Sequence, residues 1–227
     1  MIKATYVDHM GSDLSVVNAA RVSFGKKSDW MPRVHNGEQL VLTPKDAKLI
    51  SYLARHHHKS PFNHAFATFH VKAPIFVARQ LVKHQVGLAW NEVSRRYVDT
   101  EVEFYVPKEW RARPDKSIKQ GSAEEVVDIN PRGDIVNHYQ HALKQAKWSY
   151  EQLIRQGVAP EMARMVLPQS TMTEWYWSGT LMAFARVCNL RCKEDAQKET
   201  QDIANDIDKL CREQFPVSWN ALRNMPT

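Results

Sequence analysis

Two segments rich in aromatic and β-branched residues, HAFATFHVK at 64–72 and TEWYW at 173–177, constrain the fold of this chain most. That composition, with partial alternation of apolar and polar residues, is typical of strands. Helix-like segments surround both, without the regular strand–helix–strand alternation that builds a parallel sheet. We therefore expect an α+β fold, arranged as a single domain over residues 1–227.

Capping residues and prolines place most other elements. Ser12 is the expected N-cap of one helix, and Thr43-Pro44 gives the next a capping hydroxyl followed by a proline. Pro74 opens a helix over IFVARQLVKH, which a polar turn follows, and Gly157 ends a long amphipathic helix. The full prediction is strands at 2–8, 64–72, 104–106 and 173–177; helices at 12–23, 43–56, 75–84, 135–156, 160–166, 180–190, 196–213 and 216–223; an irregular segment at 24–42; and a charged, mobile connection at 111–132.

The charge balance favours anionic partners. The net charge is +6, which fits nucleotides, phosphorylated cofactors, folates or nucleic acid. The basic residues are scattered among acids, and this weakens the nucleic-acid interpretation. No GxGxxG or GxxxxGK[ST] occurs, so a dinucleotide would bind without a Rossmann turn or P-loop. With neither a signal pattern nor an apolar run near the roughly 18 residues of a membrane span, we expect a cytoplasmic protein without a membrane partner.

The segment Arg79–Tyr97, RQLVKHQVGLAWNEVSRRY, concentrates polar and cationic groups directly after the apolar helix start PIFVA. A solvated helix face can carry such charges. Here they continue through a turn, as expected at the end of a buried element, where binding residues gather. Arg95 and Arg96 offer planar donor forks suited to phosphate, and Asn91 and Glu92 suit a base edge or a ribose.

Three adjacent histidines, at 56–58, invite a metal-site interpretation. They cannot all face one side of a helix or strand, and Cys or Asp ligands at a useful spacing are missing, so we expect no metal. A polar helix end that presents an imidazole to a phosphate or a flavin fits this segment better.

Two isolated arginines lie among apolar neighbours, Arg164 in PEMARMVLP and Arg191 in VCNLRCKED. Each is open to two interpretations. It can be solvent-facing or structurally paired, or it can hold a carboxylate, a phosphate or a polarised carbonyl at a helix end.

Several ordered blocks between residues 13 and 191 resemble the flavin-dependent thymidylate synthase family. They are DLSVVNAARVSF, KSPFNHAFATFHVKAPIFVARQLVKH, NEVSRRY, ARMVLP and NLR. The resemblance implies methylation of dUMP to dTMP, with FAD as cofactor and with NADPH and 5,10-methylenetetrahydrofolate as co-substrates. It also implies a mixed sheet with flanking helices and a long central helix, and a homotetramer with active sites shared between subunits.

The resemblance also implies roles for individual residues. Arg191 matches the family arginine that favours ionisation at N3 of the uracil, and a guanidinium beside a ring carbonyl does stabilise such charge. Ser94 resembles the signature serine, a pyrimidine-orienting hydroxyl, and these two are the catalytic candidates. The implied dUMP contacts are Gln80, Lys83, Glu92, Ser94, Arg95, Arg96, Arg164 and Arg191. The implied FAD contacts are His58, Ser60, Lys83, His84, Gln85, Asn91, Glu92 and Arg186.

The signature segment of this chain departs from the family pattern, in which an Arg-His-Arg triplet is followed by seven residues and then by a serine. Here the triplet is Lys83-His84-Gln85, and eight residues precede Ser94. One ammonium and one neutral amide replace two guanidinium forks, which lowers the positive charge facing the flavin. We expect the extra residue to bulge the loop. These departures motivate a second hypothesis, the same fold making a different 5-substituted dUMP such as a hydroxymethyl product.

The cysteines separate the two classes of thymidylate synthase. None of Cys188, Cys192 and Cys211 has the Pro-Cys-His setting of the thiolate-dependent class. A flavin route needs no thiolate, because reduced flavin supplies the electrons. We expect the three to be free and buried. A non-catalytic nucleic-acid-binding module, supported only by the basic pI and the tryptophan content, is the remaining alternative.

Overall fold

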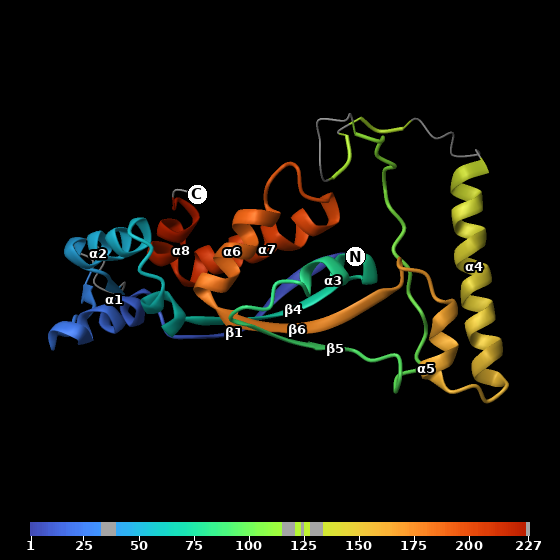
Figure 1. Cartoon of the computed structure of the whole chain (residues 1–227), viewed down its shortest axis with the longest axis horizontal. Coiled ribbons are helices and arrows are strands. Elements are labelled where there is room, and N and C mark those ends of the chain that lie inside the picture. Colours follow the sequence, from blue (N-terminus) through green and yellow to red (C-terminus); the bar gives the residue numbers. More distant parts are fainter. Residues whose placement is uncertain (33–39, 115–120, 124, 128–133, 226–227) are drawn as a thin grey trace.

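A four-stranded antiparallel sheet forms the centre of the computed structural model, which describes residues 1–32, 40–114, 121–123, 125–127 and 134–225. Its strand order is β1-β4-β6-β5 (Figure 1). The strands are β1 (Lys3–Met10), β4 (Phe66–Pro74), β5 (Leu88–Glu92) and β6 (Met172–Thr180). The long strands β4 and β6 pair along their whole length, and β5 forms an edge beside β6.

Helices cover one face of this sheet and extend beyond both of its ends (Figure 1). The helices α3 (Ile75–Leu81), α6 (Leu181–Arg191) and α7 (Lys198–Gln214) lie over the sheet. One end carries α1 (Asp13–Arg21), α2 (Pro44–Arg55) and α8 (Pro216–Arg223), and the other carries α4 (Asp134–Arg155) and α5 (Pro160–Ala163). The short elements are η1 (Val22–Phe24), η2 (Ser60–His64), η3 (Arg164–Val166), β2 (Met31–Pro32) and β3 (Leu40–Val41).

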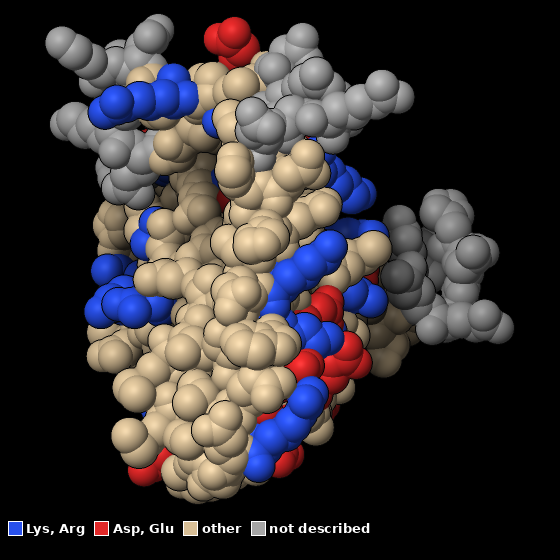
Figure 2. All heavy atoms as spheres, turned by 90° about the vertical axis from the view of Figure 1, so that its right-hand side faces the viewer, with Lys and Arg blue, Asp and Glu red and all other residues tan. Residues whose placement is uncertain are grey.

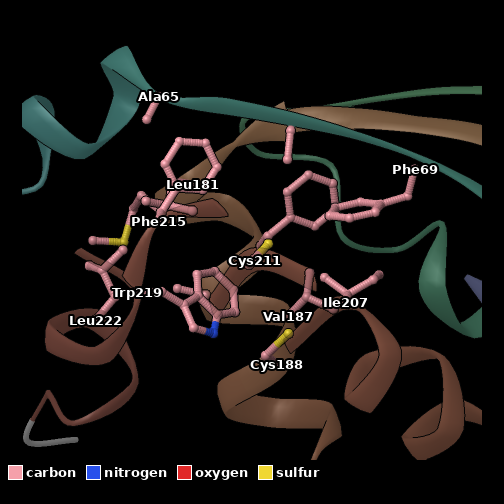
Figure 3. Packing of buried hydrophobic residues seen from close by; sticks show 14 of the residues in the cluster. Ala65, Phe69, Leu181, Val187, Cys188, Ile207, Cys211, Phe215, Trp219 and Leu222 are labelled. Carbon is pink, nitrogen blue, oxygen red and sulfur yellow. The ribbon is translucent and has the colours of Figure 1, made fainter. Parts of the chain in front are cut away.

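The core lies between the sheet and the covering helices. Phe69 of β4 and Trp177 of β6 are fully buried, and each packs edge-on against Phe184 of α6. Figure 3 shows how Trp219 and Cys188 continue this packing beneath the strands. Because burying one large apolar side chain contributes about 1.5–3 kcal/mol, this layer fixes α6 firmly against the sheet.

The α+β prediction is confirmed, and most elements match within a few residues. The pairs within the sheet are all antiparallel, where the resemblance implied a mixed sheet, and the long helix α4 lies at one end of the sheet rather than at its centre. In the irregular segment 24–42, β2 pairs with β3, and 33–39 lie outside the described residues. Much of the predicted mobile connection at 111–132 also lies outside them.

Two local predictions are wrong. The segment predicted as a polar turn contains β5, because pairing with β6 and the stacking of Trp90 on Trp175, with ring centroids 4.3 Å apart, hold this short segment extended. The predicted strand at 104–106 is reduced to one bridge between Phe104 and Thr171.

Candidate active site

Helix α6 holds the loop at residues 82–87, which joins α3 to β5. Nη2 of Arg186 donates a hydrogen bond to the carbonyl of Val86 at 2.9 Å. Gly87 has a φ of +78°, in the left-handed region that glycine favours. A Cβ at Gly179 of β6 would overlap the Gly87 carbonyl, so this close approach of loop and strand requires a glycine.

The loop and α6 enclose a cavity of about 270 Å³, called here the α6 pocket. Cationic groups lie beside apolar walls in it, and none of the described residues that line it is a carboxylate. Such a set suits a phosphorylated, partly aromatic ligand, but the volume is below the usual range of about 300–1,000 Å³ for ligand cavities. A cavity of this size would accommodate only part of a dinucleotide. The lining residues are Lys83, His84, Gln85, Val86, Leu88, Ala183, Arg186 and Leu190.

Arg191 and His84, two of the candidate residues, contact each other directly. Arg191 is the last residue of α6, and its Nε donates to Nε2 of His84 at 3.1 Å. Only a neutral imidazole can accept this bond. Burial lowers the pKa of His84, and the charges of Arg191 and Arg186 lower it further. The contact therefore fixes the direction of the Arg191 guanidinium as long as His84 is unprotonated.

The lowered pKa of His84 predicts a loss of stability in mild acid. Above pH 6.5, the ordinary pKa of histidine, the neutral imidazole of His84 stabilises the folded state. This contribution is lost as the pH falls through the lowered pKa that His84 has in the folded protein. Between about pH 8 and about pH 5, the melting temperature should fall more in the wild type than in His84→Gln, which stays neutral. Differential scanning fluorimetry of both proteins measures this. The prediction would be contradicted if the melting temperatures of the two proteins fell equally with pH.

A second cavity, of about 430 Å³, lies at the other end of β5 and is called here the β5 pocket. Glu92, Arg95 and Arg164 line it. Glu92 accepts hydrogen bonds from Thr173 Oγ1 at 2.8 Å and from Trp90 Nε1 at 3.1 Å. Both arginines donate to main-chain carbonyls in this structure. Glu101, Glu103, Glu174 and Lys72 line the cavity as well, so its lining holds four carboxylates, one lysine and two arginines. Arginines among carboxylates suit a ligand that offers both donors and a phosphate.

The other predicted residues lie outside the two cavities. Ser94 Oγ contacts Arg96 Nε at 3.1 Å, and Asn91 is exposed on β5. His58 stacks on Tyr52, with centroids 6.1 Å apart. Ser60 is exposed at the start of η2, and Gln80 of α3 accepts a hydrogen bond from Thr200 of α7.

A single chain thus divides the candidate residues into two main groups. Leu88 lines one cavity and Glu92 the other, and the four residue steps of strand from Leu88 to Glu92 span roughly 13 Å. The two linings share no residue. Sequence reasoning missed the partners Thr173 and Thr200, which lie 81 and 120 positions from the residues they contact. Neither residue lies within one of the blocks that resemble the family.

Three further predictions concern metal, membrane and cysteines. Within the described ranges, no group of three His, Cys, Asp or Glu side chains is placed to hold a metal ion. No described helix has both the length and the apolar character needed to cross a bilayer. The cysteines are free as predicted. Cys188 and Cys211 are buried, whereas Cys192 is half-buried.

Comparisons with known proteins agree with the resemblance. Residues 5–217 match the family described as "Thymidylate synthase complementing protein". The flavin-dependent thymidylate synthase of Kosmotoga olearia is 39% identical over 96% of this chain and 88% of its own length. One from Thermus thermophilus is 39% identical over 95% of this chain and 73% of its own length.

A solved structure extends the similarity to the fold. The crystal structure of the UMP/dUMP methylase PolB from Streptomyces cacaoi, bound with 5-Br dUMP, superimposes with a TM-score of 0.80. It is 31% identical, and the match covers 99% of this chain and 96% of PolB. Sequence and fold agree over nearly the whole length, and the chain belongs to the flavin-dependent thymidylate synthase family.

Proposed function

We propose that this protein methylates dUMP to dTMP, with 5,10-methylenetetrahydrofolate as carbon donor and NADPH-reduced FAD as reductant, in the cytoplasm. The observation that carries the proposal is the contact of Arg191 with His84 at the edge of the α6 pocket. It places an oriented guanidinium beside a cavity with cationic and apolar walls. Family membership supplies the chemistry that such an arrangement serves.

The protein's own groups act by binding and by electrostatics. Arg191, beside a uracil carbonyl, stabilises the negative charge that activates C5 of the pyrimidine. Lys83 and Arg186 suit the pyrophosphate of a dinucleotide, while Leu88 and Leu190 suit an apolar ring edge. FAD, when bound, supplies the electrons for reduction of the transferred carbon. Glu92 and Arg164 of the β5 pocket are assigned to the nucleotide.

The division of the candidate residues supports a homotetramer with shared active sites. Two half-sites on one chain become a whole site if a second copy places its β5 pocket against the α6 pocket of the first. The end of the molecule that carries α4 and α5 offers a surface for such contact, since most of what Figure 2 shows is neither basic nor acidic. Its exposed apolar side chains include Trp148, Met162 and Met165. Exposed apolar patches of this kind mark protein interfaces.

UMP is a second candidate substrate, because PolB is described as a methylase of both UMP and dUMP. Discrimination between UMP and dUMP would depend on whether the site accommodates the hydroxyl at C2′ of UMP. Both nucleotides therefore belong in the assay.

Mass spectrometry of the products tests the proposal. After incubation of dUMP or UMP with FAD, NADPH and methylenetetrahydrofolate, the methylated nucleotide gains roughly 14 mass units and a hydroxymethylated one roughly 30. The protein should be yellow and should bleach with NADPH. A gain of 30 would support the hydroxymethyl hypothesis, whereas a colourless protein that binds oligonucleotides would support a nucleic-acid-binding module.

A further inference from the structure

We propose that Thr200 is a positioning residue that fixes the side-chain amide of Gln80 as a hydrogen-bond donor toward an oxygen of the bound nucleotide. The inference deepens the proposed function and rests on it, because Gln80 is assigned to the dUMP site. It concerns a residue of α7, a helix that contributes no other residue to the candidate site.

The geometry of the pair carries the proposal. Thr200 Oγ1 donates to Gln80 Oε1 at 2.5 Å, and Thr200 is fully buried. A buried hydroxyl keeps its partner, since an unpaired one is costly. With Oε1 taken, the Nε2 group of Gln80 faces away from Thr200, and it makes no hydrogen bond to another described residue of the chain. Gln80 itself is only half-buried, so its side chain is not sealed inside the core.

The first turn of α7 is fixed strongly enough to position Gln80. The neighbouring Glu199 is 4% exposed and accepts hydrogen bonds from Arg111 at 2.7 Å and from Tyr105 at 3.2 Å. Burial raises the pKa of Glu199, but its hydrogen bonds and the charge of Arg111 together outweigh this, so the pKa is lowered and the carboxylate stays ionised. Burial and the adjacent Glu199 raise the pKa of Tyr105 to about 12, so the phenol remains a donor.

The orientation matters because an amide offers opposite chemistry on its two sides. If Gln80 were free to turn over, it would present its carbonyl to a nucleotide oxygen about half of the time, and two acceptors would then face each other. In the flipped orientation Nε2 would donate to Thr200 Oγ1, and the buried hydroxyl would lose the acceptor to which it donates among the described residues. Because an unpaired buried donor is costly, the orientation seen here is favoured before the ligand binds. Pre-organised donors of this kind strengthen binding without a further contact.

The test is a set of dUMP dissociation constants, measured by calorimetry on the FAD-loaded protein. Thr200→Val keeps the shape of the side chain and removes the hydroxyl, and we expect it to weaken dUMP binding about twofold, because only about half of the Gln80 amides then present the donor. Thr200→Ser restores the hydroxyl and should bind dUMP as tightly as the wild type does. Thr200→Ala is measured alongside, so that poor packing of the valine does not decide the result. FAD content and melting temperature show whether each variant is folded.

A double-mutant cycle separates positioning from a structural role. In a Gln80→Ala background, Thr200→Val should leave the dUMP dissociation constant unchanged, because there is no amide to orient. Gln80→Glu, which still accepts from Thr200 but lacks the donor, should weaken dUMP binding at least as much as Gln80→Ala. Equal losses from Thr200→Val in both backgrounds, or none in either, would overturn the inference. A wild-type protein that binds no dUMP would instead refute the proposed function.

Discussion

Replacing Arg191 by alanine should lower the turnover of dUMP about 10²–10³-fold, the loss typical when one group that stabilises developing charge is removed. Arg191 ends α6, where the contact with His84 directs its guanidinium beside the α6 pocket. FAD binding should persist, because Lys83 and Arg186 line that pocket independently. Steady-state kinetics and the flavin absorbance of the purified variant measure both effects.

Two comparisons make this result specific. Arg55→Ala removes an exposed arginine from α2, outside both cavities of the candidate site, and should leave turnover unchanged. Arg191→Ala should also raise the pKa of His84, observed by NMR of the imidazole, because one of the charges that lower it is gone. Normal turnover in Arg191→Ala would refute the role assigned to this residue.

The sequence predicted the elements that local chemistry specifies. Thr43-Pro44 begins α2 as expected, and Thr43 does cap it by accepting a hydrogen bond from the N–H of Asp46. The aromatic segments became β4 and β6. In contrast, β5 is only five residues long, and pairing with β6 and the stacking of Trp90 on Trp175 hold it extended. No local pattern in LAWNE records that tertiary contact, so the strand was predicted as a turn.

The candidate site shows the same limit. The resemblance singled out His84 and Arg191, which lie 107 positions apart in the sequence and contact each other in the fold. It did not reveal that Glu92 and Arg164 line a separate cavity on the same chain. The separation of the two cavities follows from the pairing between β5 and β6, and a list of site residues contains no information on that pairing.

Mixing two inactive variants tests whether the halves of the site come from different copies. Arg191→Ala disables the α6 pocket, and Arg164→Ala disables the β5 pocket. In a one-to-one mixture of subunits, about a quarter of the shared sites should combine two intact halves, so up to about a quarter of wild-type activity should return. The assay is dTMP formation after the two tagged variants are co-expressed and purified together.

A matched mixture supplies the control for this experiment. Lys83 lines the same cavity as the part of α6 that precedes Arg191. A mixture of Lys83→Ala with Arg191→Ala should therefore restore no activity, because every α6 pocket then carries one defect. If each chain instead formed its own complete site, the Arg191→Ala and Arg164→Ala mixture would also stay inactive, because every chain carries one defect. Recovery in the first mixture and not in the second is expected only when a site takes its α6 pocket from one subunit and its β5 pocket from another.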